Sequence, residues 1–181
     1  MKTIKPFSML MALITLTGLS CSWGAAPKVS EGPLIKTATP EAQMVESPAP
    51  DKFTLVRFAT ADGQLGDLLK AEAQKAKEAG RTPFVEFYAD WCGPCQALRK
   101  SLSDQRMIEA FKGTYIIQLN LDEWQPQLGG AGFNVFGIPA FYAIDGEGKP
   151  TGRMITGGAW GEDIPENMAP PLGDFFSGKT N

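Results

Sequence analysis

The sequence predicts an α/β domain in which helices flank a central mixed β-sheet, and three observations lead to this prediction. Apolar segments of strand-like composition alternate with segments of helical spacing in the first half of the domain. A turn-rich segment joins two further strand-like segments in the second half. Alternating strands and helices favour parallel strands, and a closing hairpin adds antiparallel ones, so the sheet is expected to be mixed.

The first half of the domain contains the alternating pattern. Residues 53–58 are expected to form a strand. Leu65–Ala79 has apolar residues at helical spacing and is followed by Gly80, a typical C-cap, so a helix is expected there. Residues 83–89 are expected to form a buried strand, because they are apolar on both faces except for Glu86. A further helix should begin at or near Cys92.

The second half combines weaker signals. Ser103 and Asp104 can cap a helical turn that continues through Phe111, and residues 114–121 read as a strand. Residues 140–144 and 153–156 are expected to form a hairpin, because Asp-Gly-Glu-Gly-Lys-Pro separates them. Three prolines lie between residues 165 and 171, so only a short final helix near residues 172–176 is expected.

This domain is expected to occupy residues 53–181, because the residues before it differ in composition. Residues 22–52 contain five prolines among Ala, Ser, Thr, Glu and Lys. A segment of this composition buries too little apolar surface to offset its ordering entropy, so a disordered linker is expected. It either tethers the domain or is a tail without a function of its own.

Residues 1–21 have the pattern of an export signal. Two lysines precede the apolar run Phe7–Leu19, which is shorter than the roughly 20 residues that a helix needs to cross a bilayer. The run leads to Cys21, as in a bacterial lipoprotein signal, where the cysteine is lipidated and becomes the mature N-terminus. Gly18 stands where that signal usually has leucine, so cleavage nearby by ordinary signal peptidase is the alternative. Either route removes Cys21 from disulfide and metal chemistry and places the protein in the bacterial periplasm.

Cys92 and Cys95 stand in the motif Cys-Gly-Pro-Cys, and thiols at this spacing can close a small, reversible disulfide. At a helix N-terminus, free backbone N–H groups and the helix dipole favour the thiolate form of Cys92. Pro94 fits the first helical turn, and Gly93 lets another backbone approach. In the cycle that this predicts, Cys92 attacks a substrate disulfide. Cys95, the buried partner, then attacks the mixed disulfide and releases the reduced substrate.

Other uses of the two thiols have less support. A closed zinc site needs four nitrogen or sulfur ligands, and the chain has no histidine and only one further cysteine. The lack of histidine also excludes a copper site of two cysteines and a histidine, and Gln96 after Cys95 excludes the c-type haem signature. A purely structural disulfide remains an alternative, although so small a ring adds little loop entropy. No metal, and no cofactor beyond the redox-active disulfide, is therefore expected.

Three segments resemble thioredoxin. Residues 84–95 (Phe-Val-Glu-Phe-Tyr-Ala-Asp-Trp-Cys-Gly-Pro-Cys) look like its central strand and active-site turn. Residues 118–122 and 133–140 are similar to its third strand and to the loop before its fourth, in the same order and at similar spacing. The run Phe-Tyr-Ala-Asp-Trp-Cys also resembles the C-terminal periplasmic domain of the membrane protein that carries reducing power outward. The resemblance covers roughly residues 80–160 and implies the thioredoxin fold.

The resemblance also implies roles for single residues. Pro139 matches a cis-proline that lies against the disulfide and presents the backbone of Ile138 to an extended substrate. Glu86 matches the buried acid that takes the proton of Cys95, because burial raises the pKa of a carboxyl toward neutrality. Trp91 is expected to cover the edge of the active site. The chain departs from the family in having Glu rather than Asp at this position. It also has Gln118 in place of a lysine, so charge assistance to the acid is expected to be missing.

The resemblance implies a thiol–disulfide oxidoreductase that reduces protein disulfides and is recharged by a membrane thiol-reductant donor. The signal-like N-terminal segment adds the expectation that this protein is exported. The formal net charge is −3 and no basic stripe is present, so nucleic acid is not an expected partner. A monomer is expected, attached to a membrane only through lipidated Cys21. One alternative is a specialised reductant for apocytochrome c maturation. Another is a thioredoxin-fold binding or assembly module whose cysteines are incidental.

Overall fold

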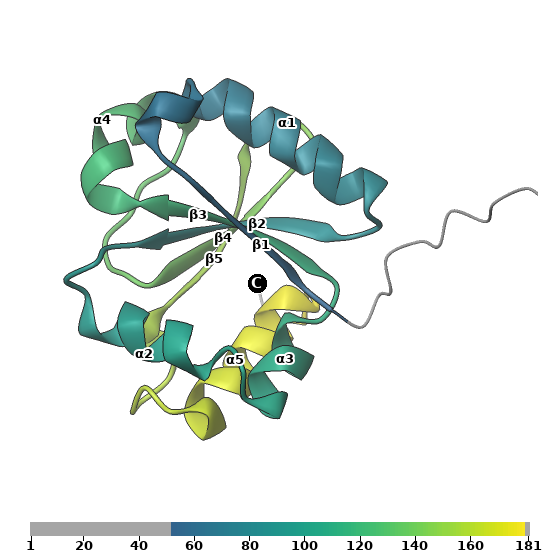
Figure 1. Ribbon diagram of the computed structural model, residues 1–181, viewed down its shortest axis with the longest axis vertical. Helices are drawn as coiled ribbons and strands as arrows, with labels where there is room; N and C mark the ends of the chain where they lie inside the picture. The colour runs from purple at the N-terminus through teal and green to yellow at the C-terminus, as the bar shows by residue number, and fades with distance from the viewer. Residues whose placement is uncertain (1–51, 180–181) are drawn as a thin grey trace, which may run out of the picture. The chain divides into compact units, whose positions relative to one another are not determined.

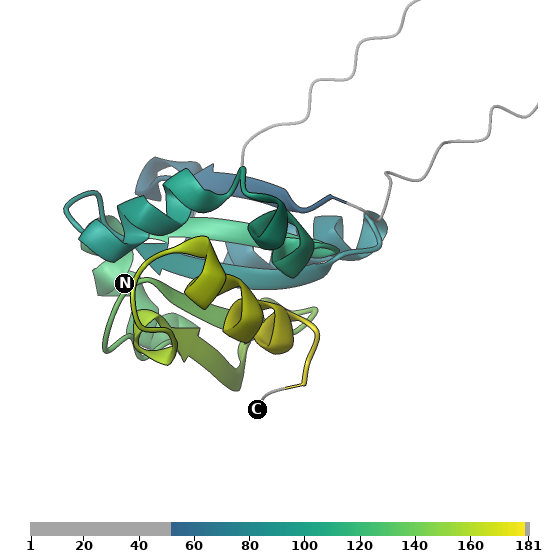
Figure 2. The same cartoon turned by 90° about the horizontal axis from the view of Figure 1, so that it is seen from below.

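The computed structural model describes residues 52–179, in which a five-stranded sheet lies between two layers of helices (Figure 1, Figure 2). The strand order is β1-β3-β2-β4-β5. Strands β1, β3 and β2 are mutually parallel, whereas β4 runs antiparallel to both of its neighbours. The strands are β1 (Thr54–Phe58), β2 (Thr82–Tyr88), β3 (Thr114–Asn120), β4 (Ala140–Ile144) and β5 (Pro150–Thr156).

The helices divide between the two faces of the sheet. Helices α1 and α4 cover one face, and α2, α3 and α5 cover the other (Figure 1). Two short 3-10 turns, η1 and η2, follow β1 and β5. The bounds are η1 (Thr60–Asp62), α1 (Leu65–Glu78), α2 (Gly93–Ser101), α3 (Gln105–Phe111), α4 (Leu121–Ala131), η2 (Gly157–Ala159) and α5 (Pro165–Phe176).

A separate apolar core lies under each layer of helices. On the α1 and α4 side, Leu69, Trp124 and alternate residues of the central strands pack together. On the other side, Leu98 of α2 and Phe111 of α3 pack against Phe176 of α5. Aromatic rings dominate this second core: the Phe111 and Phe176 ring centroids are 4.8 Å apart. Strand β2, which carries Glu86 and precedes the cysteine motif, is the central strand of the sheet. Its apolar side chains contribute to both cores.

The mixed sheet and most of the expected elements are confirmed. Helix α1 ends next to Gly80, whose φ of 64° is the left-handed conformation typical of a glycine after a helix. Asp104 caps α3 by accepting a hydrogen bond from the backbone N–H of Arg106. The hairpin between β4 and β5 is present, but β5 begins at Pro150, earlier than residue 153.

Residues 122–131 form a helix that the sequence pattern did not predict. Helix α4 begins at Leu121, so the expected strand of residues 114–121 ends one residue earlier, at Asn120. Pro126 lies inside this helix, where proline removes one backbone hydrogen bond, and this obscured the helical pattern. Burial of Trp124 offsets that loss, and its indole N–H donates to the carbonyl oxygen of Phe58 at 3.2 Å.

The final helix is longer than the short segment expected near residues 172–176. Helix α5 starts at Pro165, a residue type that suits the first helical turn because its missing N–H has no partner there anyway. Pro170 and Pro171 lie inside the helix. Tertiary packing outweighs their low helix propensity, since Met168, Leu172 and Phe175 are all buried on one side of α5.

The expected signal segment 1–21 with Cys21, and the expected linker as far as residue 51, lie outside the described residues. Between residues 52 and 179, no helix combines the length and the apolar composition that crossing a membrane requires.

Candidate active site

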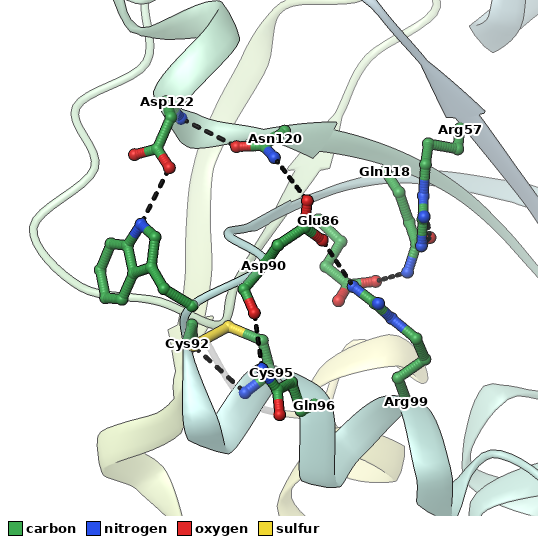
Figure 3. Close-up of polar contacts among 11 residues, drawn as sticks. Arg57, Glu86, Asp90, Cys92, Cys95, Gln96, Arg99, Gln118, Asn120 and Asp122 are labelled. Atoms are coloured by element: carbon green, nitrogen blue, oxygen red, sulfur yellow. Dashed lines mark hydrogen bonds and ion pairs between the residues drawn. A yellow bond between two sulfur atoms is a disulfide. The ribbon is translucent and has the colours of Figure 1, made fainter.

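The two motif cysteines meet at the start of α2. Their sulfur atoms form a disulfide with an S–S distance of 2.06 Å (Figure 3). Cys92 is the N-cap residue of α2 rather than a member of the helix, and its Sγ accepts a hydrogen bond from the backbone N–H of Cys95 at 3.2 Å. A sulfur atom at this position faces the free N–H groups of the first turn, which favour a thiolate after reduction.

Both cysteine side chains are almost buried in the disulfide form, with 3% of Cys92 and 1% of Cys95 exposed. Their positions relative to α2 distinguish them. Cys92 precedes the helix and follows Trp91, which is exposed, whereas Cys95 lies within the first helical turn. The choice of Cys92 as the attacking sulfur therefore rests on its N-cap position.

The loop before β4 lies against the disulfide. The Ile138–Pro139 peptide bond is cis, as the resemblance implies. The carbonyl oxygen of Ile138 lies 3.8 Å from Cys92 Sγ, and the Ile138 side chain packs against the cluster that contains both cysteines. The backbone N–H of Gly157 donates to the carbonyl oxygen of Pro139 at 2.9 Å, which ties this loop to the end of β5. Residue 138 can therefore offer its backbone beside the reactive sulfur.

Trp91 is at the surface beside the motif, with 69% of the residue exposed, so it is not a packed core aromatic. Its indole N–H donates to Asp122 Oδ2 at 2.8 Å (Figure 3). Asp122 belongs to the first turn of α4, which Asn120 caps by accepting from the Asp122 backbone N–H. This role of α4 was not predicted from the sequence, because the helix itself was not predicted. Through Asp122, α4 binds Trp91, the residue before Cys92.

Glu86 is buried at the centre of the sheet, with 2% of the residue exposed. Burial raises the pKa of its carboxyl to about 7, while the hydrogen bond from Gln118 and the charges of Arg99 and Arg57 act in the opposite direction. Glu86 and α2 lie on the same side of the sheet (Figure 3). A carboxyl with this pKa exchanges a proton readily near neutral pH.

The expectation that charge assistance to Glu86 is missing was wrong. Gln118 Nε2 donates to Glu86 Oε2 at 2.7 Å, and Gln118 Oε1 accepts from Arg57 Nε at 3.3 Å and from Nη2 at 3.1 Å. The guanidinium of Arg57 thus stands one side chain away from the acid. A second guanidinium, that of Arg99, also lowers the pKa of Glu86.

The two arginines reach the site from different elements and meet at Tyr88. The guanidinium carbon of Arg57 is 4.8 Å from the centre of the Tyr88 ring, and that of Arg99 is 5.1 Å from it. Arginine over an aromatic face is a favourable contact. Neither arginine was among the predicted site residues. Strand pairing brings Arg57 to the site and the packing of α2 brings Arg99 there, and no sequence motif marks either residue.

Around the disulfide the structure places the rest of the motif, Trp91, Gly93 and Pro94, together with the Ile138–Pro139 loop, and it places Glu86 inside β2, on the α2 side of the sheet. Cys21 lies outside the described residues. Among residues 52–179 there is no group of three His, Cys, Asp or Glu side chains placed to hold a metal ion.

The family model described as thioredoxin matches residues 70–169, which is more than half of the chain. Among curated proteins, the thiol:disulfide interchange protein TxlA of Synechococcus elongatus is 33% identical over 76 residues, 41% of this chain and 39% of that protein. Its homologue from Synechocystis is 36% identical over 99 residues, 50% of this chain and 53% of that protein. The thiol:disulfide interchange protein DsbD of Vibrio cholerae is 35% identical over 104 residues, 54% of this chain but 17% of that protein.

These relatives are matched only in part. The chain spans about two fifths and about half of the lengths of the two cyanobacterial proteins. The range matched by the family model includes β2 to β5, the cysteine motif and the loop before β4.

Proposed function

Because this chain belongs to the thioredoxin family, we propose that it is an exported thiol–disulfide oxidoreductase that reduces protein disulfides through Cys92 and Cys95. The observation that carries this proposal is the Cys92–Cys95 disulfide at the N-terminus of α2. The Ile138 carbonyl beside Cys92 and the buried carboxyl of Glu86 add a place for the substrate backbone and a proton acceptor.

The reaction starts from the reduced pair. The Cys92 thiolate attacks one sulfur of a substrate disulfide, the substrate S–S bond breaks, and one substrate thiolate leaves while a mixed disulfide forms. Cys95 then passes its proton to the Glu86 carboxylate and attacks the Cys92 sulfur. The bond between Cys92 and the substrate breaks, and the second substrate thiolate leaves. Two electrons have moved to the substrate, and the Cys92–Cys95 disulfide described here is the oxidised product.

Protonation keeps the cycle balanced. Each departing substrate thiolate takes up a proton, and Glu86 returns its proton to solvent before the next round. An external dithiol then reduces the Cys92–Cys95 disulfide by the same exchange in reverse. We assign this recharging to a membrane thiol-reductant donor, a role that the similarity to the DsbD protein supports.

The direction of electron flow follows from the Cys-Gly-Pro-Cys motif, which resembles that of the reducing members of the family. Equilibration of the pair against glutathione buffers tests it. A reductant should remain oxidised in any buffer that is not strongly reducing, because its disulfide is the more stable state. A pair that is reduced as readily as that of a strong oxidant would contradict the proposal.

The location that we propose is the bacterial periplasm, with a lipid anchor on Cys21. The support is the lysine-led apolar run before Cys21 and its small flanking residues. Replacing Cys21 with alanine should move the protein from the membrane fraction to the soluble fraction, while Ser22→Ala, a matched change one residue on, should leave it with the membranes. Unchanged fractionation of the Cys21→Ala protein would reject lipidation.

A further inference from the structure

Three side chains form a row across three neighbouring strands. Arg57 of β1 is in register with Gln118 of β3, and Gln118 is in register with Glu86 of β2. Side chains in register on adjacent parallel strands lie on the same face of the sheet. Hydrogen bonds connect the three side chains in this order. The Arg57 guanidinium donates to the side-chain oxygen Oε1 of Gln118, and the side-chain NH₂ group of Gln118 donates to the Glu86 carboxyl (Figure 3).

The two ends of the Gln118 side chain differ chemically. The amide oxygen only accepts hydrogen bonds and the NH₂ group only donates them, while a guanidinium has no acceptor at all. If the Gln118 amide turned over, its NH₂ group would face the donors of Arg57. Arg57 therefore permits one orientation of the amide, in which the NH₂ group faces Glu86.

This orientation matters for the proton acceptor. An NH₂ group that faces a carboxyl favours the ionised carboxylate, because the protonated form can use one fewer acceptor site. A turned amide would present its oxygen to Glu86 and could accept a hydrogen bond from the protonated acid, which would favour the neutral form. The orientation of one amide thus decides which protonation state Gln118 supports.

We propose that Arg57 is a positioning residue for the proton acceptor: it fixes the orientation of the Gln118 amide so that its NH₂ group faces Glu86. The inference rests on the proposed function, in which Glu86 takes the Cys95 proton. It extends that function to a residue on a different strand, whose described contacts are with Gln118 and Tyr88 rather than with the cysteine motif or with Ile138. The attack of Cys95 on the mixed disulfide needs Glu86 as an ionised carboxylate that can accept a proton. By favouring the ionised form, Arg57 extends to lower pH the range in which Glu86 can do this.

Other charged or titratable groups near Glu86 must be separated from this effect. From α2, Arg99 acts on Glu86 by charge, and Cys95 is the proposed proton source. On β2, the ring of Tyr88 lies against both arginines, and in the turn that follows, Asp90 lies 3.8 Å from Arg99 in an ion pair. β4 places the apolar Phe141 in register with Glu86. Arg99 is the useful comparison, because no hydrogen bond to Gln118 is present among its described contacts.

The test is the titration of the Glu86 side-chain carboxyl in the oxidised full-length protein, followed by carbon-13 NMR. The wild-type midpoint is expected at about 7. Arg57→Met should raise it by about one pH unit, a tenfold change in the ionisation constant, because both the amide orientation and a nearby charge are lost. Arg57→Lys keeps a positively charged group that only donates hydrogen bonds, so the Glu86 midpoint should stay close to the wild-type value.

The same substitutions in a Gln118→Met protein separate the effect of amide orientation from the effect of the Arg57 charge. In the Gln118→Met protein no amide is left to orient, so Arg57→Met should move the midpoint much less than it does in the wild type. Arg99→Met is the matched control, and its effect should be the same in both backgrounds. Arg57→Gln, which can both donate and accept, is a second variant in case Arg57→Met does not fold, and it should also raise the midpoint.

Equal shifts from Arg57→Met in both backgrounds would overturn the inference and leave only a charge effect. No shift in either background would overturn it as well. The titration needs no turnover, so it stands apart from the proposed function: a protein that fails to reduce protein disulfides, yet shows the expected titrations, would retain the positioning role and lose the enzymatic one.

Discussion

Replacement of Cys95 by alanine is expected to leave the chain covalently attached to its substrates through Cys92. Cys92 can still attack a disulfide, since it is the cysteine at the N-cap beside exposed Trp91. Without the second thiol the mixed disulfide cannot be resolved internally, so turnover should fall to the uncatalysed rate. The complexes should appear as higher-mass bands on non-reducing gels of cells that express the variant, and they should disappear when the sample is reduced.

The matched control is the double variant Cys92→Ala/Cys95→Ala, which should trap nothing. The trapped partners also separate the remaining functional alternatives. A varied set of exported proteins agrees with a general reductant, whereas a set made up of cytochrome c precursors indicates a specialised reductant. If nothing is trapped and Cys92→Ala cells behave normally, the cysteines are incidental and the chain is a binding module.

Replacement of Glu86 by glutamine is expected to slow the resolving step by about 100-fold, the lower range for loss of a general base. Glutamine keeps the volume and can still accept a hydrogen bond from Gln118, so the fold should be retained. The wild-type rate should rise with pH through about 7, as Glu86 becomes able to accept a proton. In the variant this rise should be absent. Stopped-flow measurement of mixed-disulfide decay checks both points, and an unchanged pH profile would remove Glu86 from the mechanism.

The same substitution should change stability in a pH-dependent way. The pKa of Glu86 is raised in the folded chain, from 4.5 to about 7, so the folded state binds more protons than the unfolded state between these values. The free energy of unfolding of the wild type therefore falls as pH rises through this window. At pH 8 the Glu86→Gln protein should be more stable by about 3 kcal/mol, and below pH 4.5 the difference should vanish. Urea unfolding at the two pH values measures it.

The parts of the site that lie close together in the sequence could be predicted from it. The motif at Cys92–Cys95 specifies a helix start, and the apolar run around Glu86 indicates a buried strand with one acid inside. Local spacing contains this information, because a helix N-terminus and a buried strand each have a short-range signature. The structure places these elements as expected, with Cys92 at the N-cap and Glu86 in β2.

Arg57 could not be found in this way. Its relation to Glu86 depends on β3 lying between β1 and β2, and on a register that aligns Arg57 with Gln118. Strand order and register are long-range properties, and a shift of one residue would turn Arg57 to the other face. The sequence shows that residue 118 is glutamine rather than lysine, but it does not show that Arg57 on the neighbouring strand supplies a cation there.

Helices α4 and α5 were missed or shortened for a different reason. Prolines inside both lower the helix propensity, so the local signal points away from a helix. Burial of large side chains such as Trp124 and Phe175 against the sheet decides the outcome instead. For α4 this has a functional consequence, since Asp122 in its first turn holds Trp91 at the edge of the site.

The reduction potential of the Cys92–Cys95 pair tests most directly whether this pair donates electrons to protein disulfides. The purified protein is equilibrated over a series of glutathione ratios, and the reduced fraction is counted by alkylation and mass spectrometry, with Cys92→Ser as the control for incomplete alkylation. We expect a value close to that of thioredoxin, about −270 mV. A value near that of a strong disulfide oxidant, about −120 mV, would contradict it and reverse the direction of electron flow.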